Sequence, residues 1–549
     1  MCGIWSYITY SQTNLSNSIQ KYINNSDTVG CRGPDKKISI YRDNYTFIFY
    51  RLAIHDLSVQ GDQPFIYNFE DGYKIELMCN GEIYNYKELL EQYSFNVKST
   101  SDCEIIGHLI YYFKFDLIKV LEVLRGEFAF VAVSTYPNGK QYLSIARDTF
   151  GVRPLYYGLT NNGIILSSLL NGIINNKIDT DSIKGYHFPP GHIYHEEIKD
   201  FNLKDDFTYL CKNAFNKFKQ IPLIEIDPNA DSIYFNREDL LKYYKAITDS
   251  FIHAVKIRLN SERDIGFLLS GGLDSSLIAA IATKICNFKN IKTFSIGFNE
   301  NAPDLEYAWL VADHLNTNHT PVIIETTDAI NAIPNVIKAL ETYDITTIRA
   351  STPQYLLAQY IKEVTDIKVI LNGDGSDEVS MGYIYNYLAP SKQQAHQDSL
   401  RLLQEIHCFD GLRVDRTLGS HGLEARLPFL DIDYVETYLS MPIELRKPTK
   451  QRIEKQLLRD AFNTLYPNIL PKEVLYRKKE AFSDGVSTTK KSWFTIIKER
   501  AEWEGKTEKD WYKEIFDNNF PNQEHICPHY WMPQWSDATD PSARTLKIY

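Results

Sequence analysis

The sequence predicts a strand-rich α+β unit, followed by an α/β unit with a parallel sheet and a mostly helical C-terminal part. The first 190 residues contain β-branched and aromatic runs punctuated by Gly, Asn, Asp and Pro, with helical patterns only at 14–24 and around 102–124. From residue 237 onward, short apolar runs alternate with helical patterns, which is typical of a parallel sheet covered on both faces. Beyond residue 376 the helical pattern dominates.

The strands of the first unit are predicted where apolar runs stand between turn residues, at 45–54, 74–86, 126–134, 140–148 and 163–168. Because these strands follow one another without alternating helices, the unit is a layered one. The cluster of turn residues FPPGH marks the exit from this unit. We therefore place a first domain at 2–191, a polar linker at 192–236 and a second domain at 237–549.

The second domain begins with a predicted helix whose apolar positions, from Leu240 to Leu259, recur at helical spacing. Strands are predicted at 265–269, 292–298, 321–325 and 368–373, and helices at 275–286, 304–316, 327–341 and 353–364. In such sheets ligands bind at the carboxyl ends of the strands. The segments that follow the strands are therefore the first candidates for a functional site.

The composition excludes several classes of protein. The chain has 549 residues and a net charge of −11, whereas a general nucleic-acid binder has a basic face, so we expect no nucleic-acid partner. No apolar run approaches 18 residues, and the first residues lack the pattern of a signal peptide, so we expect no membrane association. The eight cysteines form no CxxC pair, which argues against a disulfide framework or zinc site and favours the reducing cytosol.

Cys2 directly follows the initiator methionine. Removal of Met1 would leave a thiol and an α-amino group on the same residue. An α-amino group has a pKa of about 7.7–8 and can act as a base near neutral pH, so this residue would be a nucleophile with its own general base. The alternative is an ordinary buried cysteine near a chain end.

Other polar residues of the first domain fit the recognition of a free amino acid. Asn80 and Gly81 suit a turn with positive φ, in which the Asn80 amide and the Gly81 N–H could form an oxyanion hole. Arg51 could bind an α-carboxylate as a bidentate fork, and Asp102 could bind an α-ammonium group. Each residue alone is equally explained by a turn or a surface ion pair.

The predicted strand at 265–269 runs into SGGLDSS and then into a helix. Glycines allow close approach of the backbone to an anion, and N–H groups at a helix N-terminus bind phosphate. Asp274, an acid within an anion site, is interpreted as a Mg²⁺ ligand. A Gly/Ser turn that caps a helix is the alternative. The residues that we expect at the phosphates are Ser270, Gly271, Gly272 and Ser275.

The predicted strand at 368–373 also ends in an acidic turn, DGSDE. Asp377 is the better second Mg²⁺ ligand of this turn. Lys455 could offset the charge that develops on leaving phosphates. The segment at 341–351 mixes acids with an arginine, which suits a small zwitterionic substrate or, equally, a structural ion-pair network.

The motifs MCGI, RGPD, RLAI, NGEIYN and SDCE, in this order and spacing, resemble those of class II glutamine amidotransferases. The resemblance implies a layered α/β/β/α N-terminal-nucleophile fold, in which Cys2 attacks the side-chain amide of glutamine. It further implies that the glutamine α-groups bind Arg51 and Asp102, and that Asn80, Gly81 and Glu82 surround the amide. Cys31 stands where the family commonly has His, which we expect to have little effect.

The second domain resembles the ATP-pyrophosphatase domain of glutamine-hydrolysing asparagine synthetases, through SGGLDSS, GLEARLPFLD, RKKEAFSDGV and the segment HYWMPQWSDATDPSARTL. The resemblance implies synthesis of asparagine from aspartate, glutamine and ATP, with Mg²⁺, internally transferred ammonia and a β-aspartyl-AMP intermediate. It places Leu268 and Ile296 at the adenine and ribose, and Asn372 and Gly373 at the nucleotide. The family usually has Ser where this chain has Asn372, and Glu where this chain has Asp374. The resemblance implies that this Glu takes part in forming the adenylate.

Asp374 leaves three interpretations open: a carboxylate that still acts, a site rebuilt for another acceptor, or a lost role. The rival functions are accordingly a related amidotransferase that acts on another carboxylate, a lactam-forming relative and a catalytically inactive scaffold. Cys2 counts against the lactam-forming relative, which would not need this nucleophile. Glutamine- and ATP-dependent production of asparagine from aspartate separates them. The sequence does not determine the oligomeric state, for which a homodimer is one expectation.

Overall fold

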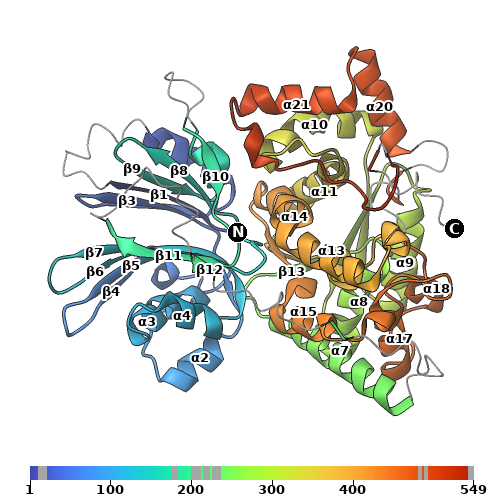
Figure 1. Cartoon of the computed structure of the whole chain (residues 1–549), viewed down its shortest axis with the longest axis horizontal. Coiled ribbons are helices and arrows are strands. Elements are labelled where there is room, and N and C mark those ends of the chain that lie inside the picture. The colour runs from blue at the N-terminus through green and yellow to red at the C-terminus, as the bar shows by residue number, and fades with distance from the viewer. Residues whose placement is uncertain are drawn as a thin grey trace.

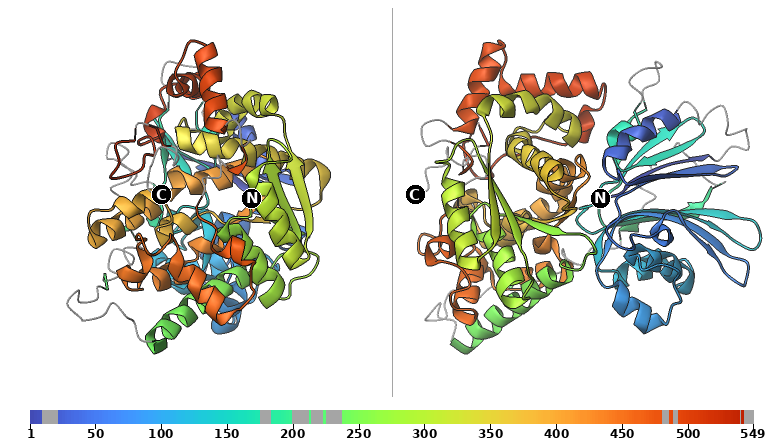
Figure 2. Two further views of the ribbon diagram at one scale, coloured as in Figure 1. Left: turned by 90° about the vertical axis from the view of Figure 1, so that its right-hand side faces the viewer. Right: turned by 180° about the vertical axis from the view of Figure 1, so that it is seen from behind.

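The computed structural model describes residues 1–9, 22–174, 183–198, 212–213, 223–224, 237–479, 485–487, 492–538 and 540–541. Two units lie side by side, and the N-terminus lies where they meet (Figure 1). The first unit contains two stacked sheets, whereas the second contains one sheet with helices around it (Figure 2). Among the described residues, no helix combines the length and apolar character that a membrane span needs.

The first sheet of the N-terminal unit is antiparallel and has the order β10-β8-β9-β1-β3-β2. Its strands are β1 (Gly3–Thr9), β2 (Lys36–Tyr41), β3 (Tyr45–Arg51), β8 (Tyr156–Thr160), β9 (Gly163–Ser167) and β10 (Gly185–His187). The neighbouring strands β1 and β3 are buried along their whole length, because both of their faces carry apolar and aromatic side chains. Gly3 lies opposite Tyr50, which places Cys2 beside the end of β3.

The second sheet has the order β12-β11-β7-β6-β5-β4 and packs face to face on the first (Figure 1). Its strands are β4 (Phe65–Asn68), β5 (Lys74–Ile83), β6 (Gly126–Thr135), β7 (Gln141–Arg147), β11 (His192–Glu197) and β12 (Lys212–Asn213). The facing sides of the two sheets form one apolar cluster, which includes Phe47 and Val131. Because β11 pairs with β7, the sheet continues past residue 191 into the segment interpreted as a linker.

Helices α2 (Tyr86–Tyr93), α3 (Ile105–Tyr112) and α4 (Leu117–Val123) cover the outer face of the second sheet (Figure 1). The single helix predicted around 102–124 is thus two helices after a 3₁₀ turn. Lys114 and Phe115 have positive φ, and the Asp116 side chain then caps α4 by accepting from Lys119 N at 3.4 Å. The helix predicted at 14–24 lies mostly outside the described residues, of which 22–26 are helical.

The sheet of the second unit is parallel, with the order β15-β14-β13-β16-β17. Its strands are β13 (Ile265–Leu268), β14 (Lys292–Gly297), β15 (Asn318–Ile323), β16 (Val369–Leu371) and β17 (Glu424–Arg426). The chain order reverses between β13 and β16, because β14 and β15 continue on one side of β13 and β16 lies on the other. The carboxyl ends of β13 and β16 therefore lie side by side, where open α/β sheets bind ligands.

Helices surround this sheet and make up most of the C-terminal part, as predicted (Figure 2). They are α7 (Arg237–Ile257), α8 (Leu273–Ala280), α9 (Pro303–Leu315), α10 (Thr326–Leu340), α11 (Ile345–Val364), α12 (Ser376–Ser380), α13 (Lys392–Glu405), α14 (Asp410–Gly419), α15 (Ile432–Leu439), α16 (Ile443–Arg446), α17 (Gln456–Leu465), α18 (Lys472–Leu475), α20 (Trp493–Trp503) and α21 (Glu508–Asn519). Helix α11 begins well before the predicted residue 353, because Asp344 caps it by accepting from Thr347 N at 2.8 Å.

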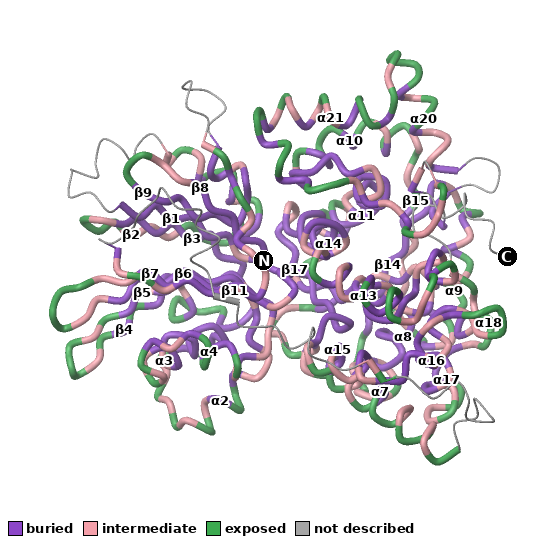
Figure 3. Tube along the Cα trace, in the orientation of Figure 1, coloured by how far each residue is buried: buried purple, intermediate pink, exposed green. Residues whose placement is uncertain are grey.

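The contact between the two units is mostly buried (Figure 3). An apolar cluster runs from Met1 and Trp5 in the first unit to Leu418 and Leu423 in the second. Charged side chains from opposite units also meet there at 2.7–3.1 Å, in the pairs Arg32–Asp415, Arg258–Glu127 and Arg426–Glu82. Since these side chains are nearly inaccessible to water, the pairs fix the relative orientation of the units.

Asp415→Asn should lower the free energy of unfolding by about 3–5 kcal/mol, because it leaves the buried Arg32 charge without a charged partner. Burial raises the pKa of Asp415, but Arg32 more than offsets this and lowers it to about 2. A carboxyl with a depressed pKa stabilises the folded state above its unfolded pKa, so this contribution should be lost as pH falls from about 4 to 2. Urea unfolding at pH 7 measures the effect.

Asp249→Asn is the matched control, because Asp249 pairs with Lys245 at 2.9 Å while both side chains are more than half exposed. Exposed pairs of this kind contribute little, so the control should keep the urea midpoint of the parent. Equal midpoints for the two variants would contradict a structural role for the Arg32–Asp415 pair.

Candidate active sites

The loop predicted to bind nucleotide lies between β13 and α8. Gly272 is the N-cap residue, and α8 begins at Leu273. Gly271 has φ +69°, and a Cβ there would lie 2.4 Å from the Cβ of Tyr307, so only glycine fits this turn. The N–H groups at the start of α8 are therefore accessible to an anion.

Hydroxyl groups brace this loop from within. Ser270 N donates to Ser275 Oγ at 3.1 Å, and the two hydroxyl oxygens are 3.1 Å apart. Gly272 N donates to Ser270 Oγ at 3.3 Å. The loop is thus held in one conformation by its own side chains.

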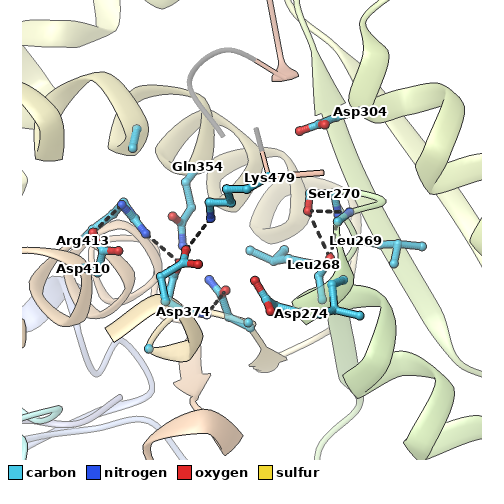
Figure 4. A pocket seen from close by; sticks show the side chains of 18 of the residues that line it. Leu268, Leu269, Ser270, Asp274, Asp304, Gln354, Asp374, Asp410, Arg413 and Lys479 are labelled. Atoms are coloured by element: carbon cyan, nitrogen blue, oxygen red, sulfur yellow. Dashed lines mark hydrogen bonds and ion pairs between the residues drawn. The ribbon is translucent and has the colours of Figure 1, made fainter. Parts of the chain in front are cut away.

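A cavity of about 250 Å³ opens at the carboxyl end of the parallel sheet (Figure 4). The predicted site residues that line it are Leu268, Ser270, Gly272, Asp274, Ser275, Ile296, Asn372, Gly373, Asp374, Asp377 and Lys455. Among the predicted nucleotide-binding residues, Gly271 alone does not line the cavity. Gly271 instead lies on the side of the loop that faces Tyr307, where a Cβ would not fit.

Two carboxylates and two lysines form an ion-pair network in this cavity. The Nζ atom of Lys455 lies 2.6 Å from Asp274 Oδ2 and 2.6 Å from Asp377 Oδ1, and Lys479 also pairs with Asp377. Burial raises the pKa of Asp377, but Lys455 and Lys479 outweigh it and hold that pKa well below its usual range. Asp377 therefore stays ionised, and both carboxylates point toward one cation position.

Asp374 is held by an arginine that the sequence analysis did not identify. Arg413 donates to Asp374 Oδ1 at 2.6 Å and to Asp410 Oδ1 at 2.7 Å (Figure 4). The other oxygen of Asp374, Oδ2, is buried and has no hydrogen-bond partner among the described residues. Burial raises the pKa of Asp374, and Arg413 opposes that shift. One face of this carboxylate therefore remains open to a ligand.

The mixed segment at 341–351 contributes an arginine that is ion-paired within the protein. Arg349 lines the cavity, but its guanidinium group donates to Glu508 at 2.9 Å and to Asp540 at 3.1 and 2.9 Å. This arginine therefore has two carboxylate partners of its own.

Cys2 lies immediately before β1, beside the residue that follows β3. Its Sγ is 3.4 Å from Leu52 N and 3.5 Å from Leu52 O, and burial raises the pKa of the thiol to about 11. The amino group of Met1 is buried against Leu423 O at 3.3 Å, and burial lowers the pKa of this amino group to about 5. Met1 thus fills part of the contact between the units, next to the thiol.

The turn predicted at Asn80 and Gly81 is wrong, because both residues lie in β5, opposite Ala129 and Phe128. A Cβ at Gly81 would lie 2.4 Å from Glu127 O, so this glycine allows β6 to approach instead of reversing the chain. The side-chain nitrogen and oxygen of Asn80 are both buried without a hydrogen-bond partner among the described residues. A buried amide of this kind favours a ligand as its partner.

Arg51 ends β3 and is almost fully buried. It donates to Ser58 O at 2.7 Å and to Asp62 Oδ1 at 2.6 Å, and it also donates to Asp56 O. The guanidinium group therefore binds the loop that follows β3 in this structure.

Glu82 and Asp102 lie close to each other beyond Asn80. Asp102 Oδ2 accepts from Ile83 N at 2.6 Å, and burial raises the pKa of Asp102. Glu82 contacts Arg426 of the second unit at 3.0 Å and His55 at 3.1 Å. Asp102, predicted at the ammonium group, and Glu82, predicted beside the amide, thus both lie near a histidine that the sequence analysis did not single out.

The sequence analysis missed three residues, although Lys479 lies within the motif RKKEAFSDGV that it used. Arg413 is on α14 and Lys479 lies in a late segment, yet both enter the cavity formed by much earlier strands. His55 follows RLAI directly, and its proximity to Glu82 depends on how the two sheets stack. These partners become apparent only after folding.

Comparison with known proteins covers the whole chain. A glutamine amidotransferase domain model matches residues 1–202, and an asparagine synthase model matches residues 246–405 and 387–538. The chain is 41% identical over 578 residues to asparagine synthetase [glutamine-hydrolyzing] from Gallus gallus, covering 100% of this chain and 99% of that protein. It is 39% identical over 580 residues to the Homo sapiens protein of the same name, with the same coverage.

Solved structures include a more distant likeness. The chain is similar to the glutamine phosphoribosylpyrophosphate amidotransferase from B. subtilis, at 15% identity and a TM-score of 0.30. The likeness covers 53% of this chain and 65% of that one.

Proposed function

The chain belongs to the glutamine-hydrolysing asparagine synthetases, and we propose how its two sites divide the reaction between them. The overall reaction converts ATP, L-aspartate, L-glutamine and water to L-asparagine, L-glutamate, AMP and diphosphate. The main support for this assignment of the two half-reactions is the position of the Cys2 thiol, which lies in the first unit beside its contact with the second.

Glutamine is hydrolysed at the first site. Removal of Met1 frees the α-amino group of Cys2, which accepts the thiol proton while the thiolate attacks the side-chain amide of glutamine. The Asn80 amide and the Gly81 N–H donate to the oxyanion that forms. The C–N bond then breaks, ammonia leaves, and water hydrolyses the thioester to give glutamate. This assignment is supported by the buried Asn80 amide, which lacks a protein partner among the described residues.

The α-groups of glutamine are bound on either side of the thiol. Arg51 binds the α-carboxylate, which takes the place of Asp62 as its charged partner. Asp102 and Glu82 bind the α-ammonium group. Ammonia then moves through the contact between the units, without exchange with bulk water, to the second site.

ATP binds in the cavity at the carboxyl end of the parallel sheet. The loop of Ser270, Gly271, Gly272 and Ser275 holds the phosphates at the N-terminus of α8. Leu268 and Ile296 flank the adenine and ribose, and Asn372 and Gly373 contact the nucleotide. Lys455 and Lys479 neutralise charge on the departing pyrophosphate.

Mg²⁺ fits the donor set of this cavity. Asp274 and Asp377 direct carboxylate oxygens to one cation position, which the ammonium group of Lys455 occupies at 2.6 Å from each. Within the described ranges no group of three or more His, Cys, Asp and Glu residues could hold a metal, and Mg²⁺ at nucleotide sites typically takes one or two carboxylates plus phosphates and water. When bound, Mg²⁺ neutralises the charge of the triphosphate.

Aspartate reacts beside Asp374. Its β-carboxylate attacks the α-phosphorus of ATP, pyrophosphate leaves, and ammonia then attacks the β-aspartyl-AMP to release asparagine and AMP. Arg413 orients Asp374 through the 2.6 Å contact, so that Oδ2 faces the substrate. Exclusion of water from this cavity during the reaction would keep the adenylate from being hydrolysed.

Steady-state turnover tests the whole proposal. We expect asparagine, AMP and glutamate to form in equal amounts from aspartate, glutamine and ATP, and ammonia to replace glutamine. Formation of AMP with another carboxylic acid, but not with aspartate, would contradict aspartate as the acceptor.

Asp374→Ala should reduce pyrophosphate release with aspartate, ATP and ammonia by about 10²-fold, because it removes a group that positions the substrate. Asp374→Glu should keep or raise the rate, since one further methylene extends the carboxylate into the cavity while Arg413 can still hold it. Glutamine hydrolysis, measured in the same preparations, is the internal control. Turnover of Asp374→Ala at the parent rate would exclude a role for Asp374.

The location and assembly of the protein are further expectations. The seven cysteines that the structure describes form no disulfide, which supports the reducing cytosol as the compartment. A homodimer stays a prediction for measurement of mass in solution.

A further inference from the structure

His55 lies among the residues that we place at the α-ammonium group of glutamine. It is 9% exposed, and its Nε2 is 3.1 Å from Glu82 Oε2. Its ring centroid is 6.1 Å from that of Tyr86 on α2. Asp102, in the 3₁₀ turn before α3, and Arg426 on β17 are the other charged groups that act on it. Groups from each of these surrounding elements therefore determine its charge.

The carboxylates of this cluster outnumber its permanent cation. Arg426 is 3.0 Å from Glu82, and it also pairs with Glu424 at 2.9 Å. Glu82, Asp102 and Glu424 therefore share one guanidinium group, which favours a further cation beside Glu82. An imidazolium at His55 supplies that positive charge from within the protein, and the ammonium group of a ligand would supply it from outside.

We propose that the His55 imidazolium competes with the α-ammonium group of glutamine for Glu82 and Asp102, so that glutamine binding releases a proton from His55 to solvent. The inference rests on the proposed glutamine site and adds a residue that sets its affinity. His55 is a positioning residue, because it acts on the two carboxylates and takes no part in the attack on the amide.

The direction of the pH dependence follows from the same contacts. Burial lowers the pKa of His55, but Glu82, with a smaller contribution from Asp102, outweighs it and raises the pKa to about 9. Below that pH the imidazolium predominates and opposes the ligand. The KM for glutamine should therefore fall as pH rises from 6.5 to 8.5, until His55 loses its proton.

Two substitutions separate charge from hydrogen bonding at His55. His55→Gln keeps a hydrogen-bond donor without a charge, and should lower the glutamine KM at pH 7 by about tenfold and flatten its pH dependence. His55→Lys keeps a positive charge throughout this range, so its KM should stay high at pH 8.5. His108→Gln is the matched control. His108, on α3, also faces a carboxylate, that of Glu104 at 4.0 Å.

A ligand control identifies the group that competes. Glutaramic acid, which is glutamine without its α-amino group, should inhibit glutamine hydrolysis equally well in the parent and in His55→Gln. Glutamine itself should distinguish the two proteins. Equal gains for both ligands would overturn competition with the ammonium group.

Proton release gives a test that does not depend on His55 variants. Titration calorimetry of Cys2→Ala with glutamine at pH 7.5, in two buffers of different ionisation enthalpy, should report release of about one proton for each glutamine bound. Absence of proton release, or an unchanged or higher KM in His55→Gln, would overturn the inference. Absence of glutamate formation by the parent would instead overturn the proposed glutamine site.

Discussion

Cys2→Ala should abolish glutamine-dependent asparagine synthesis, with a loss of at least about 10³-fold, because no other group at the first site can form the thioester. Synthesis with free ammonia should stay within about twofold of the parent, since ammonia reaches the second site without glutamine hydrolysis. Alanine is also small enough to permit removal of Met1. Glutamate and asparagine formation, measured with glutamine or with ammonia, separates the two activities.

Cys31→Ala is the matched control for this substitution, because Cys31 lies in the same unit and is exposed. It should retain both glutamine-dependent and ammonia-dependent synthesis. Glutamine-dependent synthesis by Cys2→Ala at the parent rate would show that another nucleophile is used. Loss of both activities would instead indicate that Cys2 supports the fold at the contact between the units.

Asp274→Asn and Asp377→Asn should each reduce ammonia-dependent pyrophosphate release by at least about 10³-fold, as expected when several kcal/mol of metal-mediated charge stabilisation are lost. A neutral amide is a weaker ligand for a hard cation than a carboxylate. Each substitution also removes one of the two carboxylates that contact Lys455. Glutamine hydrolysis should remain measurable, because it takes place in the other unit.

Asp264→Asn controls for the same chemical change outside the cavity. Asp264 pairs with Lys292 at 2.8 Å, and its side chain is 61% exposed, so pyrophosphate release should match the parent. Undiminished AMP formation in Asp274→Asn or Asp377→Asn would contradict the assignment of that residue as a metal ligand. Titration with Mg²⁺ tests it further, since a weakened site should need a higher concentration for half-maximal rate.

The parallel sheet and its ligand-binding edge could be predicted because local patterns determine them. Short apolar runs followed by Ser270 and by Asp374 indicated two strand ends, and the strand order then placed these ends side by side. The layered first unit was predicted from successive apolar runs separated by turn residues. Its helix around 102–124 was predicted as continuous, since apolar periodicity does not register the positive φ of Lys114 and Phe115.

The error at Asn80 and Gly81 has a physical cause. An Asn-Gly pair is common in turns because both residues tolerate positive φ, but glycine is also required where two strands approach closely. The 2.4 Å distance from a Cβ at Gly81 to Glu127 O identifies the second case. Only the position of the partner strand distinguishes these two uses of glycine, and the residues around Gly81 do not reveal that position.

Most of the polar network at the second site could not be predicted, because its members come from distant parts of the chain. Arg413 reaches Asp374 from α14, and Lys479 reaches Asp377 from beyond α18. Their residue types are ordinary for exposed helices and loops. Packing of the C-terminal helices against the sheet is what removes them from solvent and directs them into the cavity.

The charged contact between the units also bears on how the protein is made. Ribosomes add about 5–20 residues per second, so the first unit waits tens of seconds for its partner after it has emerged. Arg32 and Glu82 face water during that interval, since Asp415 and Arg426 are not yet synthesised. A face that carries hydrated charges beside its apolar residues resists aggregation better than a wholly apolar face of the same size. The same side chains then become a dry and specific contact once the chain is complete, so the surface that joins the two units also protects the unfinished one.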